Sequence, residues 1–63
     1  MQYEEHYVVT LTTPGGEAIS EKYDDAGEAT DVYDQAVRML AKGCKIELHR
    51  HSSVMLGSAA RAR

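Results

Sequence analysis

The sequence of 63 residues contains no tryptophan, no phenylalanine, one proline and one cysteine. Without a second cysteine, no disulfide can form within the chain, which fits a reducing compartment. Without tryptophan or phenylalanine, aromatic burial depends on four tyrosines. A domain of this length lies near the lower limit of stability, because it has little apolar surface to bury. We therefore expect a single domain with a thin core.

Long apolar runs are also missing, since no stretch approaches the ~20 apolar residues that a membrane-spanning helix needs. The N-terminal segment MQYEEHYVV carries acidic residues where a secretory signal peptide needs basic ones. Both observations predict a cytoplasmic protein that makes no membrane contact. A hydrophobic content of 43% with 27% charged residues is typical of a folded globular domain.

Charge is distributed unevenly along the chain. Residues 1–34 contain nine acidic residues and one basic residue, whereas residues 35–63 contain six basic residues and one acidic residue. The formal net charge of −3 therefore hides an acidic first half and a basic second half. Such an asymmetry matters because a binding partner responds to the local field.

The pattern of apolar residues predicts two strands followed by a helix. Residues Tyr3–Thr12 alternate in polarity, and Glu17–Tyr23 do so more weakly, which is typical of strands. Between them, Thr13-Pro14-Gly15-Gly16 predicts a hairpin with a type II turn. Apolar residues then recur with helical spacing from Ala29 to Leu40, so we expect a helix over about 26–42.

The helix boundaries also have sequence signals. Asp25 is a suitable N-cap, and Glu28 three residues later would complete a capping box. Gly43 suits the position just after the helix. The alternation that begins at Cys44 predicts a third strand, extended to His51.

These elements predict an α+β fold of ββαβ type, in which a three-stranded antiparallel sheet of order 2-1-3 has one helix packed on one face. The single domain is expected to span residues 1–56, and the small, basic residues 57–63 are expected to form a flexible tail. The predicted core consists of Tyr7, Val9, Leu11, Ile19, Tyr23, Val32, Tyr33, Val37, Leu40, Ile46 and Leu48. The opposite sheet face is mostly polar and open to solvent or to a second chain.

Little in the sequence indicates catalysis, a cofactor or a metal. His6, His49 and His51 could approach one another as a minimal metal site, but histidines on the solvent face of a sheet commonly have no such role. Cys44 follows a helix C-terminus, which disfavours a reactive thiolate, so it is better explained as a core residue. Ser52 and Ser53 lack the strand–turn–helix setting of a nucleophile. We predict a protein that is not an enzyme and has no cofactor.

Acidic residues supply the candidate binding surface. Seven of the ten lie in the hairpin and the helix: Glu17, Glu21, Asp24, Asp25, Glu28, Asp31 and Asp34. Helix capping and the helix dipole explain part of this set without any partner. The other explanation is a surface that meets a basic groove on a nucleic-acid-binding protein. Direct nucleic-acid binding is disfavoured, because the basic residues are few and scattered and no aromatic residues interleave with them.

In size, element layout and charge, the whole chain resembles the small acidic inhibitor proteins of bacteriophages and mobile elements, such as anti-CRISPR proteins. The resemblance implies a non-enzymatic inhibitor in the host cytoplasm that uses the acidic hairpin–helix surface to occupy a nucleic-acid-binding site on a host protein complex. The alternative is a homodimeric structural or regulatory module, joined through the open sheet face or an exposed strand edge.

Overall fold

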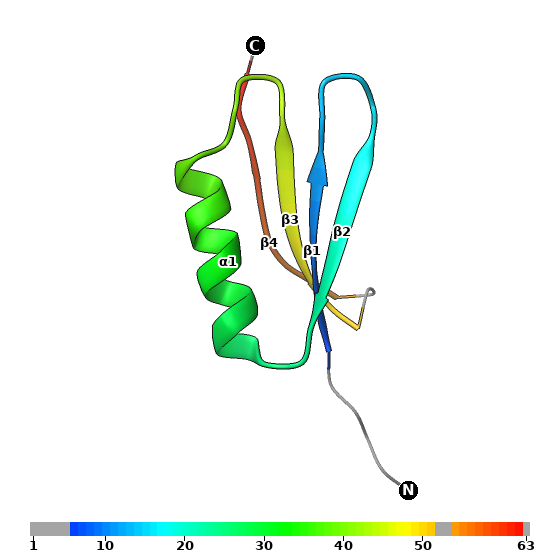
Figure 1. Ribbon diagram of the computed structural model, residues 1–63, viewed down its shortest axis with the longest axis vertical. Coiled ribbons are helices and arrows are strands. Elements are labelled where there is room, and N and C mark those ends of the chain that lie inside the picture. The colour runs from blue at the N-terminus through cyan, green and yellow to red at the C-terminus, as the bar shows by residue number, and fades with distance from the viewer. Residues whose placement is uncertain (1–5, 52–53, 63) are drawn as a thin grey trace, which may run out of the picture.

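The chain folds into a four-stranded antiparallel sheet with one helix beside it (Figure 1). The computed structural model describes residues 6–51 and 54–62. The elements along the chain are β1 (Tyr7–Thr12), β2 (Ala18–Tyr23), α1 (Ala26–Arg38), β3 (Lys45–Arg50) and β4 (Val54–Ala60). The predicted α+β class, the antiparallel pairing and the neighbours β2-β1-β3 are confirmed, but the sheet has four strands in the order β2-β1-β3-β4, not three.

Strand register determines which side chains share each face of the sheet. Val9 of β1 lies opposite Glu21 of β2 and Leu48 of β3. Directly opposite residues point to the same face, so these three residues lie on the face that carries the core. The other face presents mainly small and polar side chains: Val8, Thr10 and Thr12 of β1, Ala18, Ser20 and Lys22 of β2, Lys45, Glu47 and His49 of β3.

The turn between β1 and β2 differs from the predicted type II turn. The amide of Gly16 donates to the Thr13 carbonyl oxygen at 2.9 Å, which closes a four-residue turn. The positive φ of 91° belongs to Gly16 and not to Gly15. A type II turn needs the positive φ at its third residue, whereas a type I turn followed by a left-handed glycine has it at the fourth. The observed turn is of the second kind.

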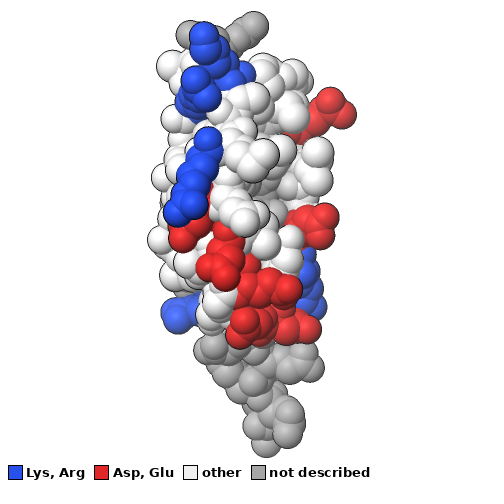
Figure 2. Space-filling view, turned by 60° about the vertical axis from the view of Figure 1, so that its left-hand side comes forward, with Lys and Arg blue, Asp and Glu red and all other residues white. Residues whose placement is uncertain are grey.

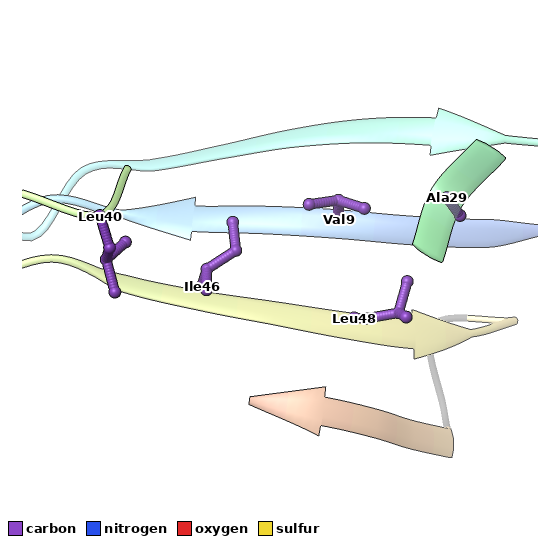
Figure 3. Packing of buried hydrophobic residues seen from close by; sticks show 5 residues of the cluster. All are labelled: Val9, Ala29, Leu40, Ile46 and Leu48. Carbon is purple, nitrogen blue, oxygen red and sulfur yellow. The ribbon is translucent and has the colours of Figure 1, made fainter. Parts of the chain in front are cut away.

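The core is small and lies between α1 and the two central strands. In the described residues the buried hydrophobic side chains are Val9, Ala29, Leu40, Ile46 and Leu48 (Figure 3). Tyr7, Leu11, Tyr23, Val32 and Tyr33 are only partly buried against them. Two predicted core residues are not buried: Ile19 is 56% exposed and Val37 is 37% exposed. Ile19 lies on the edge strand β2, whereas α1 packs mainly on β1 and β3.

Helix α1 ends four residues before the predicted position. Its last residue is Arg38, and Met39 forms the C-cap, with its amide donating to the Gln35 carbonyl oxygen at 3.1 Å. The chain then turns, so that Leu40 enters the core with 6% exposure. Gly43 has a positive φ of 82°, but it belongs to the turn that leads into β3 and not to the helix end.

The main correction concerns the C-terminal segment, where residues 57–60 belong to β4 and not to a flexible tail. Four pairs, from Lys45↔Ala60 to Leu48↔Gly57, align this half of β4 with β3. A shift of register between Leu48 and His49 then creates a bulge. The packing at Gly57 is tight, since a Cβ atom there would lie only 3.1 Å from the Tyr33 side chain. Beyond the strand, the Arg61 guanidinium donates to the Leu40 carbonyl oxygen at 3.0 Å.

Candidate acidic binding surface

The seven acidic residues selected from the sequence are all exposed. The connection from β2 to α1 is short, so it brings the end of β2 next to the first turn of the helix (Figure 1). Four of the seven gather at this corner, and two more continue along the helix. We call these six residues the acidic surface: Glu21, Asp24, Asp25, Glu28, Asp31 and Asp34. Figure 2 shows most of the acidic side chains on this face gathered toward the lower end, with basic side chains both above and beside them.

Glu17 is separated from this group. It lies between the β1–β2 turn and β2, whereas Asp24 follows the other end of the strand. At a rise of about 3.3 Å per residue, the seven intervening steps place Glu17 about 23 Å from the corner. The sequence counted Glu17 with the others because it is near them in the chain, but the direction of β2 takes it to the opposite end of the sheet.

Asp25 has a structural role that accounts for its charge. It is the N-cap of α1, with extended backbone angles, and its Oδ2 accepts a hydrogen bond from the Glu28 amide at 3.0 Å. This confirms the predicted cap. The described residues contain no return bond from the Asp25 amide to the Glu28 carboxylate, so only half of the predicted capping box forms. Glu28 still lies in the first turn, where its negative charge interacts favourably with the positive end of the helix dipole.

Asp31 and Asp34 lie beyond the first turn of α1, where neither capping nor the helix dipole explains them. Both are exposed, while Ala29, Val32 and Tyr33 contact the core. Among the residues that the structure describes, the only ion pair joins Lys45 to Glu47 at 3.3 Å. Asp34 therefore forms no ion pair with Arg38, which follows four residues later on α1. The carboxylates of Asp31 and Asp34 remain available to a partner.

Basic residues gather at the opposite end of α1. Arg38 occupies its last turn, and Lys42 follows in the turn before β3. The β3–β4 ladder brings Arg61 to the same end, because the Gly43 amide donates to its carbonyl oxygen at 2.7 Å. Positive charge at this end interacts favourably with the negative end of the helix dipole. These basic residues thus lie at the opposite end of α1 from the acidic corner, whereas Lys22 and Arg50 lie at the acidic end of the sheet.

The three histidines do not come together as one site. The rings of His6 and His51 lie 5.1 Å apart in an edge-to-face arrangement. His49 lies on the open sheet face, opposite Val8 and Met55. In residues 6–51 and 54–62, no group of three or more His, Cys, Asp or Glu side chains is arranged to hold a metal ion.

Cys44 packs partly buried against the core, as the sequence predicts. Ser52 and Ser53 lie outside the described residues, as do the tyrosine and acids at positions 3–5. The described part of the chain encloses no pocket. None of its helices has the length and apolar character to cross a membrane.

Comparison of the chain with protein-family models, with curated proteins and with solved structures finds no match. The class is therefore defined by the observed features alone. This is a small α+β protein of ββαββ order, with acidic and basic residues concentrated at opposite ends of its helix.

The N-cap gives a first prediction. Replacing Asp25 with alanine removes the side-chain acceptor of the Glu28 amide, and loss of such a cap costs about 1 kcal/mol. For a domain of this size, that loss lowers the melting temperature by about 4–8 °C. Thermal unfolding followed by circular dichroism measures it. Asp24→Ala is the matched control, since it removes the same charge from the adjacent exposed position and should change the melting temperature much less.

Proposed function

We propose that this protein is a non-enzymatic binding protein whose acidic surface docks onto the positively charged, nucleic-acid-binding site of a partner protein. The observation that carries the proposal is the pair Asp31 and Asp34. These carboxylates are exposed, lie beyond the capping region and have no ion pair among the described residues. Neighbouring side chains at this helical spacing lie about 5–6 Å apart, which is close to the phosphate repeat of a nucleic-acid strand.

The proposal also agrees with the energetic cost of the arrangement. Like charges three residues apart on a helix destabilise it by a few tenths of a kcal/mol per pair. Glu28, Asp31 and Asp34 form two such pairs in succession. A basic groove would convert this cost into favourable interaction and would accelerate association through electrostatic attraction.

The partner class is a protein and not a nucleic acid. The basic residues near the C-terminal end of α1 are few, and the tyrosines that the structure describes, Tyr7, Tyr23 and Tyr33, pack partly buried against the core. The resemblance to small phage and mobile-element proteins suggests an inhibitor of the anti-CRISPR or host-takeover kind, acting in the host cytoplasm. Its partner would then be a nucleic-acid-binding complex of the host.

The test is capture of partners from a bacterial lysate on immobilised protein, with identification by mass spectrometry. We expect the wild type to retain a nucleic-acid-binding protein, and we expect added DNA or RNA to displace it. The variant Asp31→Lys/Asp34→Lys should bind about 10- to 100-fold more weakly, because two carboxylates facing basic groups are reversed. High salt should weaken wild-type binding, since exposed charges are screened over about 8–10 Å at physiological ionic strength.

A matched control separates the local surface from the net charge. Asp31→Lys and Glu17→Lys change the net charge equally, but Glu17 lies at the far end of β2. Only Asp31→Lys should reduce binding of the captured protein. Equal loss in both variants would indicate a non-specific charge effect, and unchanged binding in the double variant would refute the proposed surface. Circular dichroism must show the same folded spectrum for all variants.

A further inference from the structure

Three basic residues gather near the C-terminal end of α1, although they come from separate segments of the chain. Arg38 is in the last turn of the helix, Lys42 lies in the connection to β3, and Arg61 follows β4. The Gly43 amide donates to the Arg61 carbonyl oxygen at 2.7 Å, and this bond holds the end of β4 beside that connection. We call Arg38, Lys42 and Arg61 the basic end.

The charged groups of the basic end are available to a partner. All three residues are exposed. Among the described residues the only ion pair joins Lys45 to Glu47, so the basic end forms none there. The Arg61 guanidinium donates to the Leu40 carbonyl oxygen at 3.0 Å, which fixes its position and leaves further N–H donors for an anion. A guanidinium that is already held in place loses less conformational entropy when it binds.

Arg38 lies on the same outer face of α1 as the acids that carry the proposed function. Residues four and seven positions apart on a helix share one face, so Asp34 and Asp31 form a stripe with Arg38. At a rise of about 1.5 Å per residue, their axial distances from Arg38 are about 6 and 10 Å. All three side chains are exposed, and Asp34 and Arg38 do not pair with each other. The stripe therefore changes sign within a short distance.

An interface centred on Asp31 and Asp34 must include this change of sign. A standard interface buries about 800 Å² on each partner, which corresponds to a patch roughly 30 Å across. The helix of 13 residues is only about 20 Å long, so such a patch covers its whole outer face. A partner surface that was basic throughout would place positive charge against Arg38, and like charges that face each other across an interface are strongly unfavourable. The partner therefore needs acidic groups at that position.

We infer that the partner protein carries both signs of charge, with a basic groove that meets the acidic surface and carboxylates that meet the basic end. This inference rests on the proposed function, because it adds a second contact to the same interface. Opposite charges at two points fix the direction in which the protein lies in the groove, which favours specificity more than affinity. A uniformly basic protein is disfavoured as the partner, because it repels the basic end.

Two synthetic peptides test the inference as defined probes. Each has a block of lysines and then a spacer of about four prolines, which spans about 12 Å as an extended polyproline helix. The first peptide ends in a block of glutamates and the second in an equal block of glutamines. At low ionic strength, we expect the glutamate peptide to bind the wild type about 3- to 30-fold more tightly in fluorescence anisotropy, because ion pairs form at the basic end as well. Attraction by net charge alone gives the opposite order, since the glutamine peptide is the more positive.

Reversing the charge of the basic end should invert this preference. With Arg38→Glu/Lys42→Glu, the glutamine peptide should bind more tightly than the glutamate peptide. If this variant does not fold, Arg38→Gln/Lys42→Gln should abolish the preference instead. The matched control is Lys22→Glu/Lys45→Glu, which changes the net charge equally but lies on the open sheet face. This control should keep the preference for the glutamate peptide.

The outcomes separate this inference from the proposed function. Equal binding of the two peptides to the wild type, or tighter binding of the glutamine peptide, would overturn the inference alone. An unchanged preference after reversal of the basic end would do the same, as would loss of the preference in the control. The proposed function fails if Asp31→Lys/Asp34→Lys binds both peptides as tightly as the wild type does, and the inference then fails with it. Circular dichroism verifies that each variant is folded.

Discussion

A chain that ends at Leu56 is expected to lose cooperative unfolding. Removing residues 57–63 deletes four of the residue pairs that join β3 to β4, together with the contact between Gly57 and the Tyr33 ring. It also uncovers one side of β3, where Ile46 and Leu48 are 2% and 6% exposed. Uncovering about half of two such side chains costs about 1.5–3 kcal/mol, before the lost backbone pairing is added.

That loss is large compared with the total stability. Domains have about 0.05–0.15 kcal/mol of unfolding free energy per residue, which gives roughly 3–9 kcal/mol for this chain. Urea denaturation followed by circular dichroism will measure the effect. The control is a chain ending at Arg61, which keeps all of β4 and the hydrogen bond to Leu40 and should unfold like the full-length protein. A cooperative transition of wild-type midpoint in the chain ending at Leu56 would mean that residues 57–60 of β4 contribute nothing to stability.

The second large effect is expected at Ile46. Replacing it with alanine should destabilise the domain by about 2–5 kcal/mol, since the substitution removes apolar contacts and leaves a cavity. Among residues 6–51 and 54–62, Ile46 is the largest side chain that is essentially completely buried, and it lies on β3 between β1 and β4. Such a loss approaches the total stability of the domain, so much of the variant should be unfolded at 25 °C.

Ile19 is the matched control for Ile46. Both isoleucines lie on the helix-side face, and both flank Leu11 in the ladders of β1 with β2 and β3. Ile19 is 56% exposed, so Ile19→Ala should cost less than about 1 kcal/mol. If Ile46→Ala is too unstable for measurement, Ile46→Val can be compared with Ile19→Val, with an expected cost of about 0.5–1.5 kcal/mol at position 46. Equal effects at the two positions would contradict the described core.

Local signals in the sequence were sufficient for the first three strands and the start of the helix. Alternation identified β1, β2 and β3, because a strand half covered by a helix buries every second residue. Asp25 marked the helix start, because its side chain satisfies an amide of the first turn. The predicted C-terminal end of the helix, at about residue 42, was wrong. The spacing of Leu40 fits the apolar face of a helix, but this residue reaches the core from just after the C-cap.

The fourth strand was missed for a specific reason. Residues 57–60 are Gly-Ser-Ala-Ala, which have weak strand propensity and no apolar alternation. Their conformation is determined by pairing with β3 and by the Tyr33 ring above Gly57. Both β3 and Tyr33 are distant from these residues in the sequence, so no local pattern predicts the strand.

At the candidate site too, some features follow from the sequence and others only from the tertiary structure. The sequence alone determined the composition of each half of the chain, the scarcity of aromatic and cysteine residues, and the helical spacing that makes Asp31 and Asp34 neighbours. Only the tertiary structure decided that Glu17 lies apart from the other acids, that Ile46 is buried while Ile19 is exposed, and that β4 forms an uncharged edge. Spacing along one element follows from its backbone geometry, but burial and proximity between elements depend on which segments pair across the sheet.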